Sequence, residues 1–205
     1  MSIAENSLQL KKDFDDVYKA GYDKGSQETR LIFWDGLQNK GYGANYYYAF
    51  AYNRFDDDNF NPMYKIKSTD TSTGTQCIFY NNTLITDTKV EIIAGKNAGS
   101  CFYGMSNCHT ICKFTVKEET TFYNTFNKTT SLVNIEIGGT IGENFDIHWS
   151  TKLSKESIIS IINALSGTKS SLTVTFSEEA VNNSFTTDEW NELVATKSNW
   201  TISLV

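Results

Sequence analysis

Three weak copies of one pattern follow one another between about residues 80 and 141, and this repetition restricts the fold more than any other feature. Apolar residues recur at a spacing of 21 residues in three positions, occupied by Leu84, Met105 and Phe126, by Val90, Ile111 and Leu132, and by Ile93, Phe114 and Ile135. A short strand with its return segment cannot bury its apolar side alone and must stack on a neighbour. The repetition therefore predicts stacked units with a cap at each end.

The composition indicates a β-rich domain with a polar surface. Charged residues make up 20% of the 205 residues, the formal net charge is −6, aromatic residues reach 14% and proline occurs once. The sequence has no basic footprint for phosphate backbones, so nucleic acid is not an expected partner. No run of 18 apolar residues occurs, so no membrane span is expected, and residues 1–12 lack the apolar core of a signal peptide.

Residues 7–29 have a helical pattern. Leu10, Phe14, Val17 and Tyr18 recur at i, i+4, i+7 and i+8 and form one apolar stripe. The stripe predicts either a projecting helix that assembles with copies of itself, as in a short coiled coil, or a helix packed on its own domain. We therefore assign residues 1–45 to an N-terminal helical segment for oligomerisation or tethering, and residues 46–205 to the main domain.

Two further segments precede the repeats. Large aromatic residues alternate at Tyr46, Tyr48, Phe50 and Tyr52, which predicts a strand with its aromatic face covered rather than a platform on which sugars or bases stack. The acidic stretch 55–62 lacks the alternating ligands, the glycine and the distant glutamate of a calcium loop. A solvated acidic loop is the expected structure there.

Local signals are clearest after residue 141. Leu153 and Ser154 predict the start of a helix, and an apolar stripe then continues as far as Gly167. Thr186 and Glu189 have the spacing of a capping box and predict a second helix. Residues 172–176 and 200–204 alternate as strands. Two such helix–strand units predict a C-terminal cap over residues 142–205.

The candidates for chemistry are weak. The sequence has no Walker-type loop, GxSxG or HExxH motif. Cys101, Cys108, His109 and Cys112 can be drawn as a zinc site or as a Cys–His nucleophile pair, but their spacing matches no standard pair of ligands. Reduced structural thiols are the better interpretation.

The acidic and aromatic residues near the junction of repeats and cap offer no stronger site. Glu143 and Asp146 are candidate glycosidase carboxylates, although exposed acids on turns are the better interpretation. His148 and Trp149 lie at the same junction, where packing is favoured over contact with a glycan. We assign no catalytic residue, cofactor or metal, and the residues of any ligand surface stay unknown.

A family resemblance is carried by residues 132–141, 153–165, 172–176 and 197–202, and at the front by residues 18–25, 33–38 and 48–52. These segments resemble the BspA-like leucine-rich-repeat proteins of anaerobic gut bacteria and of their phages and prophages. Leu132, Ile135 and Ile137 have the LxxLxL spacing of such repeats, but the three copies lack the usual turn asparagine. The resemblance implies an α+β fold: a short, irregular leucine-rich-repeat-like β-solenoid with a helix–strand C-terminal cap and an N-terminal helix.

The resemblance also implies a function. It indicates a non-enzymatic phage virion structural protein of the tail, neck or head surface, which contributes to host attachment through its repeat domain. The expected partners are copies of itself, other virion proteins and a host-surface glycan or protein. Assembly in the host cytoplasm agrees with the absence of a signal-peptide pattern. The alternative is a bacterial cell-surface adhesin, or a carbohydrate- or protein-binding module of leucine-rich-repeat type.

Overall fold

The computed structural model describes residues 51–52, 57, 66–67 and 75–205. Its elements are β1 (Ile66–Lys67), β2 (Asp87–Ile93), β3 (Thr110–Val116), β4 (Asn134–Gly139), β5 (Phe145–Asp146), α4 (Lys155–Ala164), β6 (Leu172–Phe176), α5 (Glu178–Ser184), α6 (Thr187–Ala195) and β7 (Trp200–Leu204). The predicted oligomerisation stripe of Leu10, Phe14, Val17 and Tyr18 lies outside the described residues, as does most of the predicted aromatic strand.

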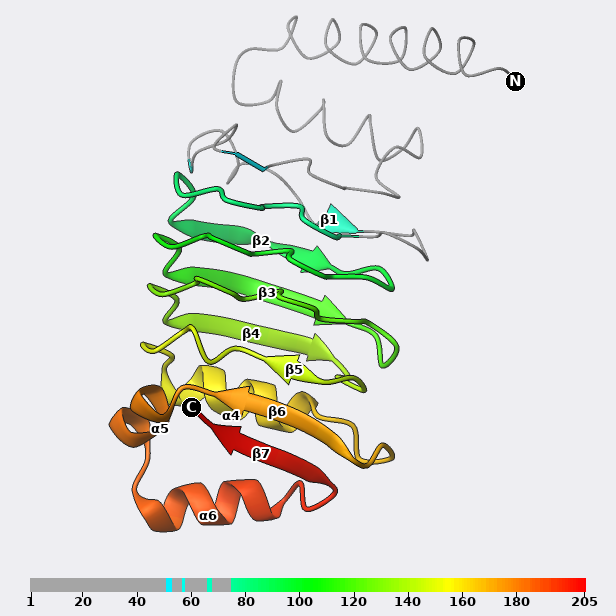
Figure 1. The fold of residues 1–205 in the computed structure, drawn as a ribbon, viewed down its shortest axis with the longest axis vertical. Helices are drawn as coiled ribbons and strands as arrows, with labels where there is room; N and C mark the ends of the chain where they lie inside the picture. The colour runs from blue at the N-terminus through cyan, green and yellow to red at the C-terminus, as the bar shows by residue number, and fades with distance from the viewer. Residues whose placement is uncertain (1–50, 53–56, 58–65, 68–74) are drawn as a thin grey trace, which may run out of the picture.

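All of these strands pair in parallel. One sheet has the order β1-β2-β3-β4 and the other has the order β5-β6-β7, so neighbours in each sheet are also successive strands of the chain. Figure 1 shows β1 to β4 stacked one below the other and pointing the same way, and β5 to β7 pointing the opposite way. Parallel neighbours cannot be joined by a tight hairpin, so the chain must cross back after each strand. Each strand and the return segment beside it form one layer of the stack.

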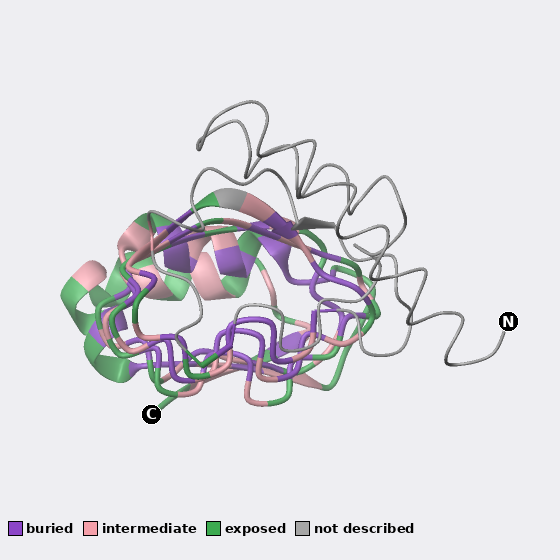
Figure 2. Cartoon of the chain, turned by 90° about the horizontal axis from the view of Figure 1, so that it is seen from above, coloured by how far each residue is buried: buried purple, intermediate pink, exposed green. Residues whose placement is uncertain are grey.

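The return segments are bonded to one another as the strands are. The backbone N–H of Phe79 donates to Cys101 O at 2.9 Å, and that of Phe102 donates to Thr125 O at 3.0 Å. Seen along the stack, the strands lie on one side and the returns on the other, with buried residues between them (Figure 2). Phe79, Phe102 and Phe126 form a column in that core, with successive ring centroids 5.7 and 5.3 Å apart.

The regularity of the layers lies in their turns. Two sets of residues with positive φ recur in the returns. The first set is Cys77, Ser100 and Asn124, with φ of 55°, 54° and 55°. The second set is Asn81, Gly104 and Lys128, with φ of 53°, 73° and 63°. The members of each set stand at equivalent places in successive layers, because the strand register pairs Asp87 with Thr110 and Thr110 with Asn134. A Cβ on Gly104 would lie 2.3 Å from Asn81 Oδ1, so a side chain here would displace the asparagine of the preceding layer.

Helix α4 takes the place of the next strand beside β4. Ser154 is its N-cap and accepts from the backbone N–H of Ser157, as the sequence predicts. The Ser157 hydroxyl accepts from Ile135 N at 2.9 Å and donates to Val133 O at 3.1 Å. One turn later, Ser160 Oγ accepts from Ile137 N at 2.8 Å. The free edge of β4 is thus satisfied by serine side chains of a helix and not by another strand.

On the opposite side of the stack, the returns give way to a sheet. Residues 145–146 form β5, which pairs with β6, and β6 pairs with β7 from Leu172↔Trp200 to Phe176↔Leu204.

The capping box of Thr186 and Glu189 is confirmed at the start of α6. The sequence analysis missed α5, a helix of seven residues with Ser177 as its N-cap. None of the described helices combines the length and the apolarity needed to cross a bilayer.

The predicted fold class is wrong as stated. The α+β leucine-rich-repeat-like β-solenoid is replaced by a mixed α/β arrangement, in which two parallel sheets are combined with three helices in the described part of the chain. The register of 21 residues is also wrong, because Ile111 pairs with Thr88 and with Ile135 rather than with the residues 21 positions away. Leu84, a predicted core position, is 47% exposed. The layers are longer than 21 residues, because Asp87 pairs with Thr110 and Thr110 pairs with Asn134.

Candidate ligand-binding groove

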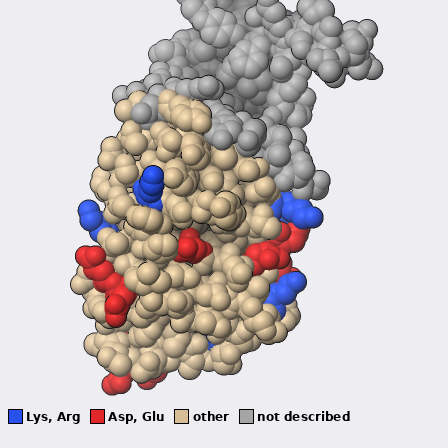
Figure 3. All heavy atoms as spheres, viewed as in Figure 1, with Lys and Arg blue, Asp and Glu red and all other residues tan. Residues whose placement is uncertain are grey.

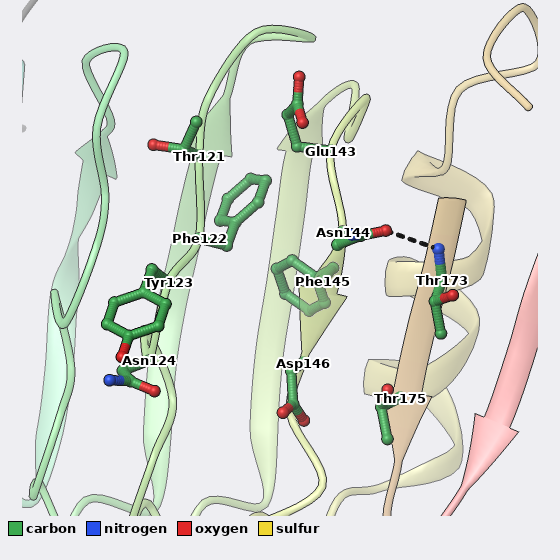
Figure 4. Close-up of a pocket in the computed structure, with 10 residues that line it drawn as sticks. All are labelled: Thr121, Phe122, Tyr123, Asn124, Glu143, Asn144, Phe145, Asp146, Thr173 and Thr175. Atoms are coloured by element: carbon green, nitrogen blue, oxygen red, sulfur yellow. Dashed lines mark hydrogen bonds between the residues drawn. The ribbon is translucent and has the colours of Figure 1, made fainter. Parts of the chain in front are cut away.

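A hollow lies on the face formed by the returns and by β5 and β6, which we call the return face. Its volume is about 520 Å³. Its lining is Thr121, Phe122, Tyr123, Asn124, Glu143, Asn144, Phe145, Asp146, Thr173 and Thr175 (Figure 4). These residues come from three successive segments of the stack. We call this hollow the groove.

Three short extended segments place the groove residues. Each segment has an apolar residue between two polar or aromatic ones: Thr121-Phe122-Tyr123, Asn144-Phe145-Asp146 and Thr173-Val174-Thr175. The central residues are buried, and the rings of the two central phenylalanines meet edge to face at 5.0 Å. Side chains alternate across extended backbone, so the flanking residues project from the return face. The core therefore fixes the positions of the groove side chains.

Tyr123 forms the aromatic wall of the groove. Its side chain is 79% exposed, more than any other large apolar side chain among the described residues. Its carbonyl oxygen accepts from Ser100 N at 2.8 Å, which ties its backbone to the preceding layer. The neighbouring residue of that layer is Gly99, where an added Cβ would lie 3.3 Å from Tyr123 O and 3.9 Å from Tyr123 Cβ. A side chain at position 99 would therefore press on the backbone of Tyr123.

Two polar side chains of the groove are held by hydrogen bonds. Asn144 Oδ1 accepts from the backbone N–H of Thr173 at 2.8 Å, which ties the second segment to the third (Figure 4). Asp146 Oδ1 accepts from His148 N at 3.1 Å and lies 2.6 Å from His148 Nδ1. The NH₂ group of Asn144 can therefore donate to a ligand, and the second carboxylate oxygen of Asp146 can accept from one.

The groove is acidic. Glu143 and Asp146 contribute two carboxylates, and none of the ten described lining residues is basic. Figure 3 shows that this face is largely uncharged, with an acidic side chain near its middle and Lys or Arg side chains away from it. Both residues are half-buried, and Asp146 lies in β5, so the expectation of exposed acids on turns does not hold for Asp146. This combination of an exposed ring, fixed amide and carboxylate groups and threonine hydroxyls suits a ligand rich in hydroxyl groups.

The predicted cysteine–histidine cluster is split between the core and the surface. Cys101 and Cys108 are buried, whereas His109 and Cys112 are exposed. Burial raises the pKa of the Cys101 thiol well above its usual value, and burial raises that of Cys108 to about 12. Both thiols are therefore protonated at neutral pH, which is the unreactive form. The described residues contain no group of three or more His, Cys, Asp or Glu that could hold a metal ion.

Other sequence candidates have structural partners. Trp149 is 39% exposed, and its ring centroid lies 5.3 Å from that of His148. Tyr52, at the end of the predicted aromatic strand, meets the ring of Tyr80 edge to face at 5.7 Å. Asp57 is the one described residue of the acidic loop, and it is not simply solvated, because its carboxylate accepts from Thr86 N at 2.9 Å. Asp57 thus caps the start of β2.

The sequence analysis missed the groove as a unit and named only its two carboxylates. The local signal is the triplet with an apolar centre, which occurs in the three segments. Nothing in the sequence says that the triplets lie side by side, since they are separated by long stretches of chain. Comparison of the chain with models of protein families, with curated proteins and with solved structures gave no match.

Proposed function

We propose that this protein is a non-enzymatic structural and attachment protein of a phage virion, and that the groove at Tyr123 is the surface with which it contacts its target. The observation that carries the attachment role is the groove itself. An exposed tyrosine stands in a hollow of about 520 Å³ between fixed polar groups. A volume of this size falls in the range of roughly 300–1,000 Å³ that is usual for sites of small ligands.

The scaffold supports a role in binding. The groove residues are attached to layers whose strands and returns are both hydrogen-bonded, and the rings behind the groove pack in the core. Binding sites on such rigid elements lose little conformational entropy when a ligand binds. The assignment to a virion is supported by the sequence resemblance alone.

The chemistry of the described groups favours a non-enzymatic role. The imidazole of His148 is held by the Asp146 carboxylate, and the structure gives it no hydroxyl or thiol partner among the described residues. The buried thiols Cys101 and Cys108 are protonated at neutral pH. Covalent catalysis needs a nucleophile with an adjacent base, and neither His148 nor the two buried thiols belongs to such a pair.

Two measurements test the proposal. Mass spectrometry of purified particles from a lysate of the strain that carries the gene should find the protein at a defined copy number. Its presence on uninfected cells and its absence from particles would contradict the virion role and favour a bacterial surface adhesin. Full-length protein should also sediment with intact host cells. Tyr123→Ala should abolish that sedimentation, whereas Tyr52→Ala, which removes an exposed ring outside the groove, should not.

A further inference from the structure

We infer that the groove at Tyr123 binds an uncharged pyranose unit of a surface polysaccharide and rejects acidic sugars. This inference rests on the proposed attachment role and adds the chemical class of the ligand. Three properties of the groove carry it: a ring open to solvent, a set of fixed donors and acceptors, and a charge of one sign.

The ring provides an apolar platform. One face of a pyranose ring presents a patch of C–H groups, which packs on the flat face of an aromatic side chain. Tyr123 is 79% exposed, so a flat ligand can reach the phenol ring. Exposed tyrosine combines a large apolar area with a polar tip and loses few rotamers on binding. A sugar ring would cover area that folding leaves in water.

The polar groups match hydroxyl groups. Each sugar hydroxyl both donates and accepts, so a sugar site needs both kinds of partner. Asn144 offers its NH₂ group as a donor, because its Oδ1 already accepts from Thr173 N at 2.8 Å. Asp146 offers an acceptor, because one of its oxygens is held by His148 at 2.6 Å. These two side chains are oriented before the ligand arrives, which reduces the entropy cost of binding.

The charge of the groove excludes acidic sugars. Glu143 and Asp146 lie in the lining, and none of the ten described lining residues is basic. A sialic acid, uronic acid or phosphorylated sugar would bring a second negative charge to carboxylates that have no positive neighbour in the lining. Like charges in a partly desolvated site disfavour binding. The same carboxylates accept hydrogen bonds from neutral hydroxyl groups without this cost.

The test uses full-length protein and an immobilised panel of neutral hexose and N-acetylhexosamine oligosaccharides, each beside a copy capped with sialic or glucuronic acid. At least one neutral glycan should bind, and its acidic copy should bind at least tenfold more weakly. Tyr123→Ala should weaken binding at least tenfold, whereas Tyr123→Phe should stay within threefold because it keeps the ring. Tyr52→Ala should bind as wild type. Because Tyr123 is exposed, its two variants should share the wild-type melting temperature.

The outcomes separate this inference from the proposed function. Sedimentation with cells that depends on Tyr123, without binding to any neutral glycan, would overturn the sugar assignment and leave the attachment role, with a surface protein as the target. Preference for the acidic copies would also overturn it. Failure to bind cells at all would contradict the attachment role itself.

Discussion

Replacement of Ser157 by alanine tests the way in which helix α4 closes the first sheet. The Ser157 side chain is buried and bonds to two backbone groups of the β4 edge, Ile135 N at 2.9 Å and Val133 O at 3.1 Å. Without the hydroxyl, Val133 O keeps a donor, because Ser154 N also donates to it at 2.9 Å. Ile135 N, in a residue that is 3% exposed, loses its acceptor. The substitution therefore leaves one buried donor unsatisfied.

The expected cost follows from that count. An unsatisfied buried N–H costs about 1–3 kcal/mol, and the net loss of a second hydrogen bond adds about 1 kcal/mol. The higher helix propensity of alanine returns about 0.5 kcal/mol. We expect Ser157→Ala to lower the free energy of unfolding by about 1.5–3.5 kcal/mol, which is a large part of the roughly 5–15 kcal/mol of a typical domain.

Urea denaturation followed by circular dichroism measures this change. The matched control is Ser160→Ala, one turn along the same helix. Ser160 makes a single bond, to Ile137 N at 2.8 Å, and is half-buried, so water can replace its hydroxyl. Its cost should stay below about 1 kcal/mol. Equal stability of Ser157→Ala and wild type, within about 0.5 kcal/mol, would refute the view that serine side chains satisfy the β4 edge.

Three further results are expected. Phe126→Ala should lower the free energy of unfolding in urea by about 3–5 kcal/mol, since this fully buried ring packs on Phe102 and Phe145, and a loss under 1 kcal/mol would contradict the core described above. The hydrogen bond from Lys155 and those from the N-cap residue Thr186 lower the pKa of Glu189 to about 2. The stability that this carboxylate contributes is therefore present above its unfolded pKa near 4.5 and is lost as the pH falls toward 2. The melting temperature of wild type should accordingly fall more steeply than that of Glu189→Gln between pH 4.5 and 2, and parallel curves would count against the contact. One thiol of the four, Cys112, should react with a thiol reagent in the native protein at pH 8 and all four after denaturation, whereas rapid reaction of two or more native thiols would show that the core is open.

The caps of the C-terminal helices were readable from the sequence because their signals are local. Ser154 and the Thr186–Glu189 pair act over three residues, and the structure confirms both. The short helix α5 was missed because its seven residues carry no apolar periodicity, although Ser177 followed by two glutamates is an N-terminal signal.

The register of the layers was not readable, because it depends on backbone shape more than on residue type. Cys77, Ser100 and Asn124 share a positive φ at equivalent turns but have no side-chain chemistry in common. An alignment of apolar residues at a fixed spacing therefore selected the exposed Leu84 as a core residue. The groove depends on that register, because it forms only where the triplets of neighbouring layers meet. Its carboxylates could be named from the sequence, but its aromatic wall could not.

The most direct test of the account is whether Tyr123 touches the target. Incorporation of 3-fluorotyrosine labels the 11 tyrosines, and the ¹⁹F resonance of Tyr123 is assigned as the one that Tyr123→Phe removes. On titration with polysaccharide extracted from the host surface, we expect this resonance to shift while that of Tyr52, assigned in the same way, stays in place. If the protein reaches saturation with polysaccharide or cells while the Tyr123 resonance does not move, the groove is not the contact surface.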